Sequence, residues 1–277
     1  MTGIGSMDDL AAHVIALSRQ GDELDRAVAT SVVHEAIDAL DRGEVRVAEV
    51  VDGEVTVHEW LKLAILLLFR VHEMDVIEVG PFEYHDKIPL KRDYASAGVR
   101  VVPGASARWG SYLAPGVILM PSYVNIGASV GAGTMVDTWA TVGSCAQIGE
   151  RVHLSGGVGI GGVLEPPQAA PVIVEDDVTI GSRCMVTQGA RVGRGSVLGE
   201  GVILNPGIPV IDAQTGDEVS RGVVPPWCIV VQASRKKEFP GGEFGLPCAL
   251  ILRRLEEGER HDKAKLNEVL REHGIAQ

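Results

Sequence analysis

The chain has 277 residues, enough for one domain or three modules, and it combines 34 glycines with only 4% aromatic residues. Its formal net charge of −12 argues against nucleic acid as the main partner. The N-terminus has no basic and apolar leader, and the most apolar stretch, Leu63–Phe69, is too short to cross a bilayer. We therefore expect a cytoplasmic protein without a membrane segment, whose four well-separated cysteines are reduced and buried.

Residues 1–100 predict a mostly helical α/β domain that precedes the rest as a cap. Apolar residues at helical spacing predict helices over residues 8–18, 24–40 and 59–73. A run of alternating apolar and polar residues predicts a hairpin over residues 45–58. Asp52-Gly53 is a strong turn signal at the centre of the hairpin. Asp41-Arg42-Gly43 ends the second helix.

From about Val101 onward, apolar residues recur at every sixth position. Fifteen of them share one phase, with one interruption: Ile118, Val124, Val130, Val136, Val142, Ile148, Leu154, Ile160, Val174, Ile180, Val186, Val192, Leu198, Leu204 and Val210. Neither a helix nor a flat strand has this period, whereas it is typical of hexapeptide-type parallel β-helices. In such a coil every sixth side chain points into one axial core. We predict a parallel β-helix over residues 101–233.

Two segments do not fit inside this coil. Eight extra residues, Leu164–Pro171, separate Ile160 from Val174, and the polar segment Asp212–Gly222 follows further on. Both must loop outward, and loops on a rigid scaffold are where binding residues collect. Residues 234–277 form a separate C-terminal segment with a break at Pro240-Gly241-Gly242, and it contains a predicted strand and helix, over residues 248–252 and 263–272.

Two familiar site motifs can be set aside. Gly157–Gly162 matches GxGxxG, but Leu154 and Ile160 keep the six-residue phase through it, so it is not the strand-to-helix turn of a dinucleotide site. We also expect no metal, because His153 is the single histidine in the coil and a three-histidine site needs more. His153 is interpreted as a corner or interface residue, with a general base as the alternative.

Three stretches of the coil closely resemble the tetrahydrodipicolinate N-succinyltransferase family: Leu119–Gly127, Gly133–Gly149 and Val152–Pro166. A looser likeness extends over Leu40–Glu49, His58–Lys62, Arg100–Pro103 and Leu266–Leu270. The resemblance implies a left-handed coil, a homotrimer with sites in grooves between neighbouring coils, and succinyl-CoA as donor. The acceptor it implies is 2-amino-6-oxopimelate, the opened form of tetrahydrodipicolinate, in the lysine and diaminopimelate pathway.

The resemblance also implies roles for particular residues. Arg100 suits an acceptor carboxylate, because guanidinium forms paired hydrogen bonds, and Asp137 can hold and help deprotonate the attacking ammonium. Without the resemblance, Asp137 would be interpreted as a corner-capping aspartate. We further expect Trp139, Glu165 and Arg183 to contact the substrate.

For the donor we expect the thioester to pass the glycine corner, with the CoA phosphates near the basic run Arg235-Lys236-Lys237. The predicted CoA-binding residues are Gly157, Gly161, Ser182, Arg235 and Lys236. Glycines expose backbone amides for the pantetheine arm, and the run is the densest positive charge near the end of the coil. The simpler interpretation of the run is a solvated surface segment.

One departure from the family pattern affects the prediction. Met185 stands where the usual pattern has a glutamate proposed as catalytic, and Gln188 replaces a second acid nearby. A thioether accepts no proton, so the sequence leaves open a divergent N-acyltransferase acting on another amino acid, or a catalytically silent trimeric relative. The segment Arg235–Leu246 is also unlike the usual family tail. The leading prediction remains an N-succinyltransferase.

Overall fold

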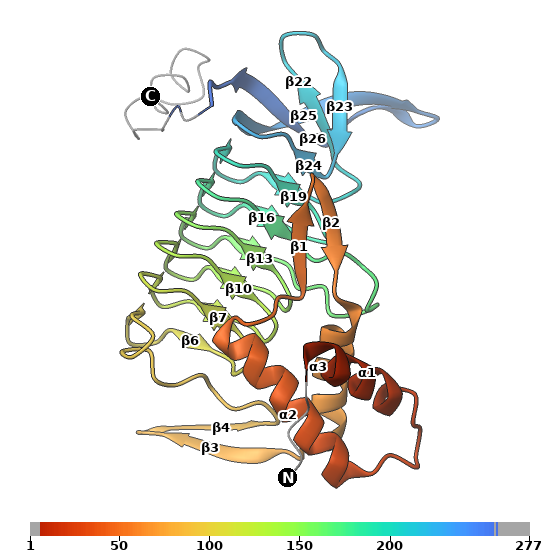
Figure 1. Ribbon diagram of the computed structural model, residues 1–277. Coiled ribbons are helices and arrows are strands. Elements are labelled where there is room, and N and C mark those ends of the chain that lie inside the picture. The colour runs from red at the N-terminus through yellow and green to blue at the C-terminus, as the bar shows by residue number, and fades with distance from the viewer. Residues whose placement is uncertain (1–5, 258, 260–277) are drawn as a thin grey trace.

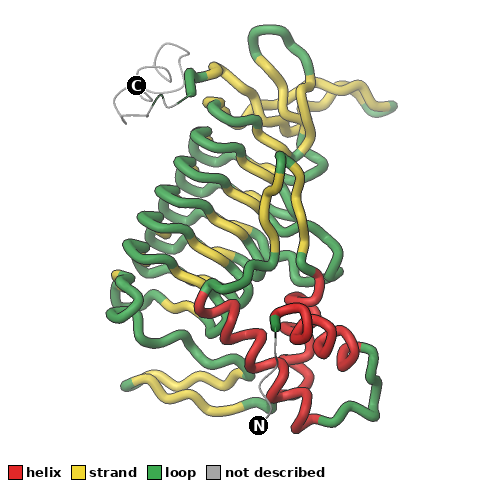
Figure 2. The backbone as a smooth tube through the Cα atoms, viewed as in Figure 1, coloured by secondary structure: helices red, strands yellow, loops and turns green. Residues whose placement is uncertain are grey.

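The computed structural model describes residues 6–257 and 259 of the chain. Figure 1 shows a helical cap at one end, a tapering stack of coils in the middle and a group of longer strands at the other end. Figure 2 shows that most of the coil is turn, with short strands aligned between the turns. Within the described residues, no helix has both the length and the apolar character needed to span a membrane.

The cap contains the predicted helices and hairpin: α1 (Met7–Ser18), α2 (Arg26–Arg42), β1 (Ala48–Val51), β2 (Glu54–Val57) and α3 (Glu59–Val71). Side chains cap both of the first helices, since Ser6 accepts from the Asp9 amide and Asp25 from the Ala27 and Val28 amides. Gly43, at φ 74°, ends α2.

A second hairpin follows that the sequence did not predict, made by β3 (Asp75–Val79) and β4 (Phe82–Asp86). Nearly all of its residues are exposed, including Val76, Phe82 and Tyr84. The hairpin therefore has no buried face, and without one the pattern of alternating apolar and polar residues that marks a half-buried strand does not arise.

The coil is built from strands of two residues: β5 (Arg100–Val101), β6 (Ser106–Ala107), β7 (Tyr112–Leu113), β8 (Ile118–Leu119), β9 (Tyr123–Val124), β10 (Ser129–Val130), β11 (Met135–Val136), β12 (Thr141–Val142), β13 (Gln147–Ile148), β14 (His153–Leu154), β15 (Gly159–Ile160), β16 (Ile173–Val174), β17 (Thr179–Ile180), β18 (Met185–Val186), β19 (Arg191–Val192), β20 (Val197–Leu198), β21 (Ile203–Leu204) and β24 (Val223–Val224). Every third strand pairs in parallel with the one below, which gives three sheets around one axis.

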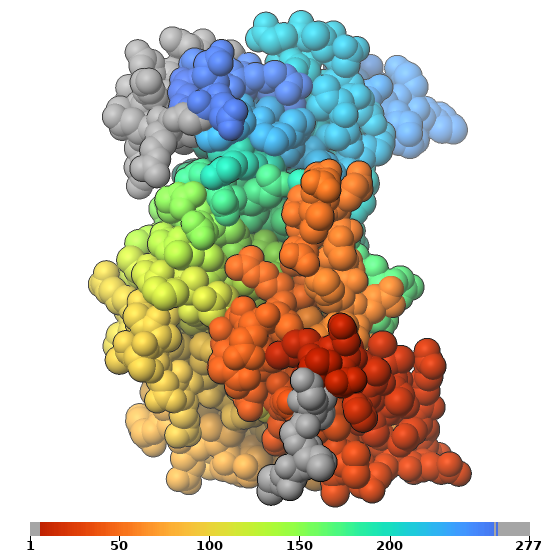
Figure 3. Space-filling view, viewed as in Figure 1, coloured from red at the N-terminus to blue at the C-terminus, as the bar shows by residue number. Residues whose placement is uncertain are grey.

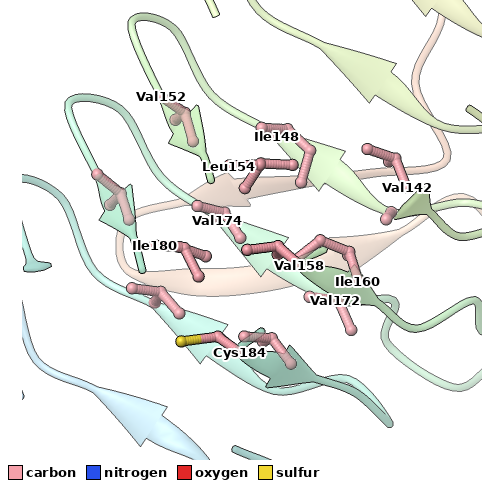
Figure 4. Close-up of a cluster of buried hydrophobic side chains, with 14 of the residues drawn as sticks. Val142, Ile148, Val152, Leu154, Val158, Ile160, Val172, Val174, Ile180 and Cys184 are labelled. Atoms are coloured by element: carbon pink, nitrogen blue, oxygen red, sulfur yellow. The ribbon is translucent and has the colours of Figure 1, made fainter. Parts of the chain in front are cut away.

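The second residue of each strand points to the axis, and Figure 4 shows these side chains packed together. Fourteen of the fifteen predicted inward residues are at most 2% exposed. Ile118 is the exception, and that prediction is wrong. Leu119 takes the inward place, because it pairs with Val101 below and Val136 above. The step from Leu119 to Val124 is five residues, so the corner at Pro121 is one residue short.

Both predicted excursions leave the coil. The first follows β15, and the second forms the hairpin β22 (Pro209–Asp212) and β23 (Glu218–Arg221). The C-terminal segment is a longer hairpin than expected, β25 (Cys228–Phe239) and β26 (Gly242–Arg254), whose turn falls at the predicted break. The boundary expected at 233/234 lies inside β25. The predicted helix over 263–272 lies outside the described residues.

The cap packs against one corner of the coil, and Figure 3 shows the two in continuous contact. The cap core includes Ile126 and Cys145 from the coil, and polar bonds reinforce the junction. Trp109 Nε1 donates to Asp38 at 2.9 Å, and the Gly110 amide donates to Asp41 at 2.8 Å. All four cysteines are free and buried, as predicted.

Candidate active site

Most of the predicted substrate residues meet at one corner of the coil, where the chain turns from the sheet of β11, β14 and β17 into the sheet of β12, β15 and β18. We call this the site corner: residues 137–140, 155–158 and 181–184 of three successive coils. Backbone bonds stack the turns, since the Gly157 amide donates to Thr138 at 2.9 Å and the Arg183 amide to Gly156 at 3.1 Å. The repeat therefore brings Asp137, Trp139, Gly157, Ser182 and Arg183 together.

Asp137 directly follows inward-pointing Val136, so its side chain turns outward at the corner. One carboxylate oxygen accepts the Thr138 amide at 2.7 Å, and the other lies 3.5 Å from His153 Nε2 on the neighbouring strand β14. The Thr138 amide, and then His153, hold the pKa of Asp137 below its usual 3.8 against the opposing effect of burial. Asp137 is therefore an anion at neutral pH.

His153 faces this carboxylate rather than a structural partner. Its Nε2 atom is buried and, among the described residues, makes no hydrogen bond. The 3.5 Å separation from Asp137 is an ion-pair distance, too long for a good hydrogen bond. One oxygen of the Asp137 carboxylate is occupied by the Thr138 amide, and the other faces the buried Nε2 atom of His153, so the second oxygen is the one available to a cation.

Trp139, Gly157 and Arg183 occupy equivalent positions in three successive coils. The Trp139 side chain is 72% exposed at a left-handed backbone position, φ 60°. A Cβ atom on Gly157 would lie 2.8 Å from Arg183 Cδ, so the glycine leaves the space in which the arginine side chain crosses the corner. The corner combines a free aromatic face with a guanidinium held against backbone.

Met185 lies on the flat face next to the site corner, on β18, and is 43% exposed. Its neighbour on β15 is Gly159, where a Cβ atom would lie 2.5 Å from the Met185 sulfur. The thioether therefore covers the backbone of Gly159 and presents an apolar surface. Gln188 lies three residues on, exposed, at the next corner of the coil.

Arg100 is exposed and lies on the same sheet as His153, but it does not contact Asp137. It belongs to β5, two strands from Met135 on β11, which corresponds to about 10 Å at the usual strand spacing. Arg100 therefore lies at the edge of the region and outside the site corner.

The basic run lies well away from the site corner. Arg235, Lys236 and Lys237 are on β25, four strands along the sheet from β11, and line a cavity of about 490 Å³ with Arg221 and Glu218. Two of the three are already paired, Arg235 with Glu218 at 3.2 Å and Lys236 with Glu243 at 2.7 Å. The run is not an isolated patch of positive charge.

Two further predicted residues lie at the loop that follows β15. Gly161 begins the loop, and its amide donates to the Val186 carbonyl at 2.8 Å. Glu165 is exposed within the loop. Lys62 of α3 was not predicted, although it donates to Ala169 of this loop at 2.6 Å. The available signal was a lysine within an apolar stretch of helix, a position where a charge is unfavourable.

In residues 6–257 and 259, no three histidine, cysteine, aspartate or glutamate side chains lie close enough together to bind a metal ion.

The chain is similar to known proteins along most of its length. Residues 13–71 match the sequence profile of the tetrahydrodipicolinate N-succinyltransferase N-terminal region, and residues 171–206 match the hexapeptide repeat of succinyl-transferase. Together with the parallel pairing of the strands, this repeat makes the coil a left-handed parallel β-helix, as predicted.

Three curated relatives carry the name 2,3,4,5-tetrahydropyridine-2,6-dicarboxylate N-succinyltransferase. The protein of Parvibaculum lavamentivorans is 49% identical over 87% of this chain and 89% of its own length. That of Paramagnetospirillum magneticum is 50% identical over 87% and 89%. That of Idiomarina loihiensis is 46% identical and covers 96% of this chain and 99% of its own length.

Proposed function

The chain belongs to the tetrahydrodipicolinate N-succinyltransferase family, and we propose that it transfers a succinyl group from succinyl-CoA to the amine of 2-amino-6-oxopimelate, the opened form of tetrahydrodipicolinate. This is a step of lysine and diaminopimelate biosynthesis. The observation that carries the proposal is identity of 49% over 87% of the chain with a relative of that name. The site corner supplies chemistry that suits the reaction.

The acceptor binds as an ammonium, which must lose a proton before its nitrogen can attack. Asp137 attracts the ammonium, and its lowered pKa makes it a better anchor than a base. An ammonium bound to the Asp137 oxygen that faces His153 would lie beside His153 Nε2, and an imidazole nitrogen can act as a general base. We assign holding to Asp137 and proton acceptance to His153.

The free amine then attacks the thioester carbonyl carbon. A C–N bond forms, and collapse of the tetrahedral intermediate breaks the C–S bond, so that CoA leaves as a thiolate. After the attack the nitrogen carries two protons, and it must lose one of them to become an amide. The proton first taken from the ammonium goes to solvent, and His153 then passes this second proton to the thiolate, which gives free CoA thiol and the amide product. Arg100 would bind an acceptor carboxylate, and Trp139, Glu165 and Arg183 would line the acceptor.

The donor would lie along the coil between two clusters described above. The amides of Gly157 and Gly161 already donate to Thr138 and Val186, so these glycines would offer the donor a backbone surface without side chains rather than free amides. Ser182 would offer a hydroxyl on the next coil. The phosphates would reach the cavity lined by Arg235 and Lys236. The four strand spacings between β11 and β25 amount to about 19 Å, and the basic run lies five to seven residues beyond Val230 along β25, so an extended donor would have to span both distances.

A homotrimer would complete this site. Trp139 is 72% exposed, and Met185 and Ile203 are each 43% exposed, on the face that carries the site. Exposed apolar side chains gathered on one face favour an interface. A neighbouring coil would cover them and turn the open face into a groove. We propose a cytoplasmic location for this trimer.

A second candidate function is N-acylation of another amino acid, and Met185 favours it. An apolar thioether above Gly159 supplies no proton acceptor and changes the shape of the acceptor side of the face. The third possibility, a silent trimeric relative, needs a site that binds CoA without turnover.

Release of CoA thiol from succinyl-CoA, measured with 2-amino-6-oxopimelate and a panel of other amino acids, distinguishes the three. We expect the highest kcat/KM with 2-amino-6-oxopimelate. A higher value with another amine would establish the divergent acyltransferase, and CoA binding without turnover on any amine would establish the silent relative.

The variant Met185→Glu tests directly whether the reaction proceeds without a carboxylate at this position. If the reaction proceeds here without the acid, the variant keeps wild-type activity or gains up to a few-fold. A large loss with 2-amino-6-oxopimelate would mean that the face has been reshaped, because a new carboxylate repels a dicarboxylate acceptor.

A further inference from the structure

Lys62 is a charged side chain inside the apolar core. It lies on the packed face of α3, between Leu61 and Ala64, and its exposed fraction is 0%. Its ammonium donates one hydrogen bond, 2.6 Å long, to the carbonyl oxygen of Ala169. Within residues 6–257 and 259, no carboxylate lies within ion-pair distance of it.

Such a position is unfavourable for helix packing alone. An ammonium loses its hydration on burial, and one neutral carbonyl compensates only part of that loss. Burial accordingly lowers the pKa of Lys62. A leucine or methionine would fill the same space without this cost, so the cation is best explained by the contact it makes.

That contact fixes the loop of residues 161–172, which leaves the coil two residues after Gly159, the glycine beneath Met185. The start of the loop is fixed by the Val163 amide, which donates to Ser144 at 3.1 Å, and by Leu164, which packs against the cap core. Lys62 holds the end of the loop. The part between, with Glu165 and Pro166, is exposed.

The end of the loop also contacts the next coil. The Ala170 carbonyl lies so close to Gly189 that a Cβ atom there would be 2.6 Å from its oxygen. The loop is therefore held between the cap and the coil above, and the held segment borders the sheet face that carries Gly159 and Met185.

We propose that Lys62 is a positioning residue for acyl transfer: its buried ammonium holds the loop so that Glu165 lies at the edge of the acceptor groove. The proposal rests on the proposed function for its kinetic consequence but not for its structural one. It assigns the cap a part in the reaction, although the cap supplies no group to the site corner.

Lys62→Met tests the assignment, because methionine keeps the length and volume and removes the charged donor. We expect kcat/KM for the acceptor to fall by about 10–100-fold through a raised KM, since small misplacement of a positioning element has effects of this size. The Tm should not fall, because a buried charge has been removed. Hydrogen exchange at the amides of residues 163–165 and 168–170 should become faster.

The matched control is Lys91→Met. Lys91 is also buried, at 9% exposure, and joins cap and coil through Asp41 at 2.7 Å, but it does not touch the loop. This variant should lower the Tm while leaving the acceptor KM and the loop exchange unchanged. Lys62→Gln, whose amide can still donate to Ala169, should recover part of the acceptor KM, and it decides the matter if Lys62→Met does not fold.

Wild-type acceptor KM and wild-type loop exchange in Lys62→Met would overturn the inference, as would equal effects of Lys62→Met and Lys91→Met. Absence of succinyl transfer by the wild-type protein would instead remove the proposed function. The loop-exchange comparison then still tests whether Lys62 holds the loop.

Discussion

The inside and the outside of the same coils follow different rules, and Val136 and Asp137 show this at adjacent positions. Val136 is fully buried and one of a series of equivalent aliphatic residues. Asp137 turns outward and has an environment, Thr138 and His153, that no other coil repeats. The inward-pointing side chains follow a six-residue period, and one aliphatic residue can replace another there. The outside is set by single contacts between coils.

The largest effect should come from the outside. Asp137→Asn keeps the shape and removes the charge that holds the ammonium beside His153, so kcat and kcat/KM for the acceptor should fall by about 10²-fold. The Tm and the elution volume of the assembly should stay at wild-type values, because the side chain is outside the core. Full activity in this variant, measured by CoA thiol release, would show that the site has been misassigned.

A substitution inside the coil should have the opposite result, with lost stability and retained activity. Leu154→Ala leaves a cavity in a fully buried position and should destabilise the fold by about 2–5 kcal/mol. Chemical denaturation measures this, with Thr141→Ala on the exposed face as the control. Folded Leu154→Ala should retain most of its kcat. A loss of kcat as large as that of Asp137→Asn would contradict the division between the two sides.

A weaker outside effect is expected from the basic run. Replacing Arg235, Lys236 and Lys237 by glutamine should raise the KM for succinyl-CoA several-fold and reduce its salt dependence, because less charge is left for screening. The effect is limited by the existing pairs with Glu218 and Glu243. An unchanged KM at low salt would assign the run to the surface rather than to the donor.

The smallest effect concerns the cap, where His34 and His72 meet with Nε2 atoms 2.7 Å apart. His72 Nδ1 lies 2.8 Å from the Lys87 carbonyl and so donates to it, which leaves His72 Nε2 to accept from His34. Burial, and then His72, lower the pKa of His34 from 6.5, although Asp38 opposes them.

At pH values between the lowered pKa of folded His34 and 6.5, the unfolded chain binds more protons at His34 than the folded protein does. Stability is therefore present above about pH 6.5 and decreases as the pH falls toward the lowered pKa. A series of Tm values between pH 7.5 and 5 should show a small extra decline in the wild type that His34→Gln removes. Parallel curves for the two proteins would show that this pair does not contribute.

The difference between inside and outside also explains what the sequence could predict. A period is visible in a sequence, so the coil, its excursions and fourteen of the fifteen inward residues followed from it. The prediction for Ile118 was wrong because one corner is a residue shorter than the others, which shifts the six-residue phase, and the composition of the sequence does not show this. The β3–β4 hairpin was missed because it buries nothing.

The contacts between coils could not be predicted in the same way. The approach of His153 to Asp137 depends on which coils lie next to each other and on how a side chain leaves a corner. Lys62 meets Ala169 across 107 positions of sequence, and no local pattern records such a meeting. The resemblance to a family supplied Arg100 and Asp137, but the surroundings of Asp137 came from the structure.

The change of strand direction at β25 has a consequence for solubility. A stack of parallel coils ends in a row of unpaired amides and carbonyls, which could template further strands and let molecules join end to end into fibres. β25 pairs in parallel with β20 but in antiparallel with β26, and the chain folds back over its own last coil. At the opposite end, the Lys91 amide donates to Ala107 on β6. Growth of the stack is thus stopped at the end that β25 closes, and a chain truncated before β26 would present a growing edge.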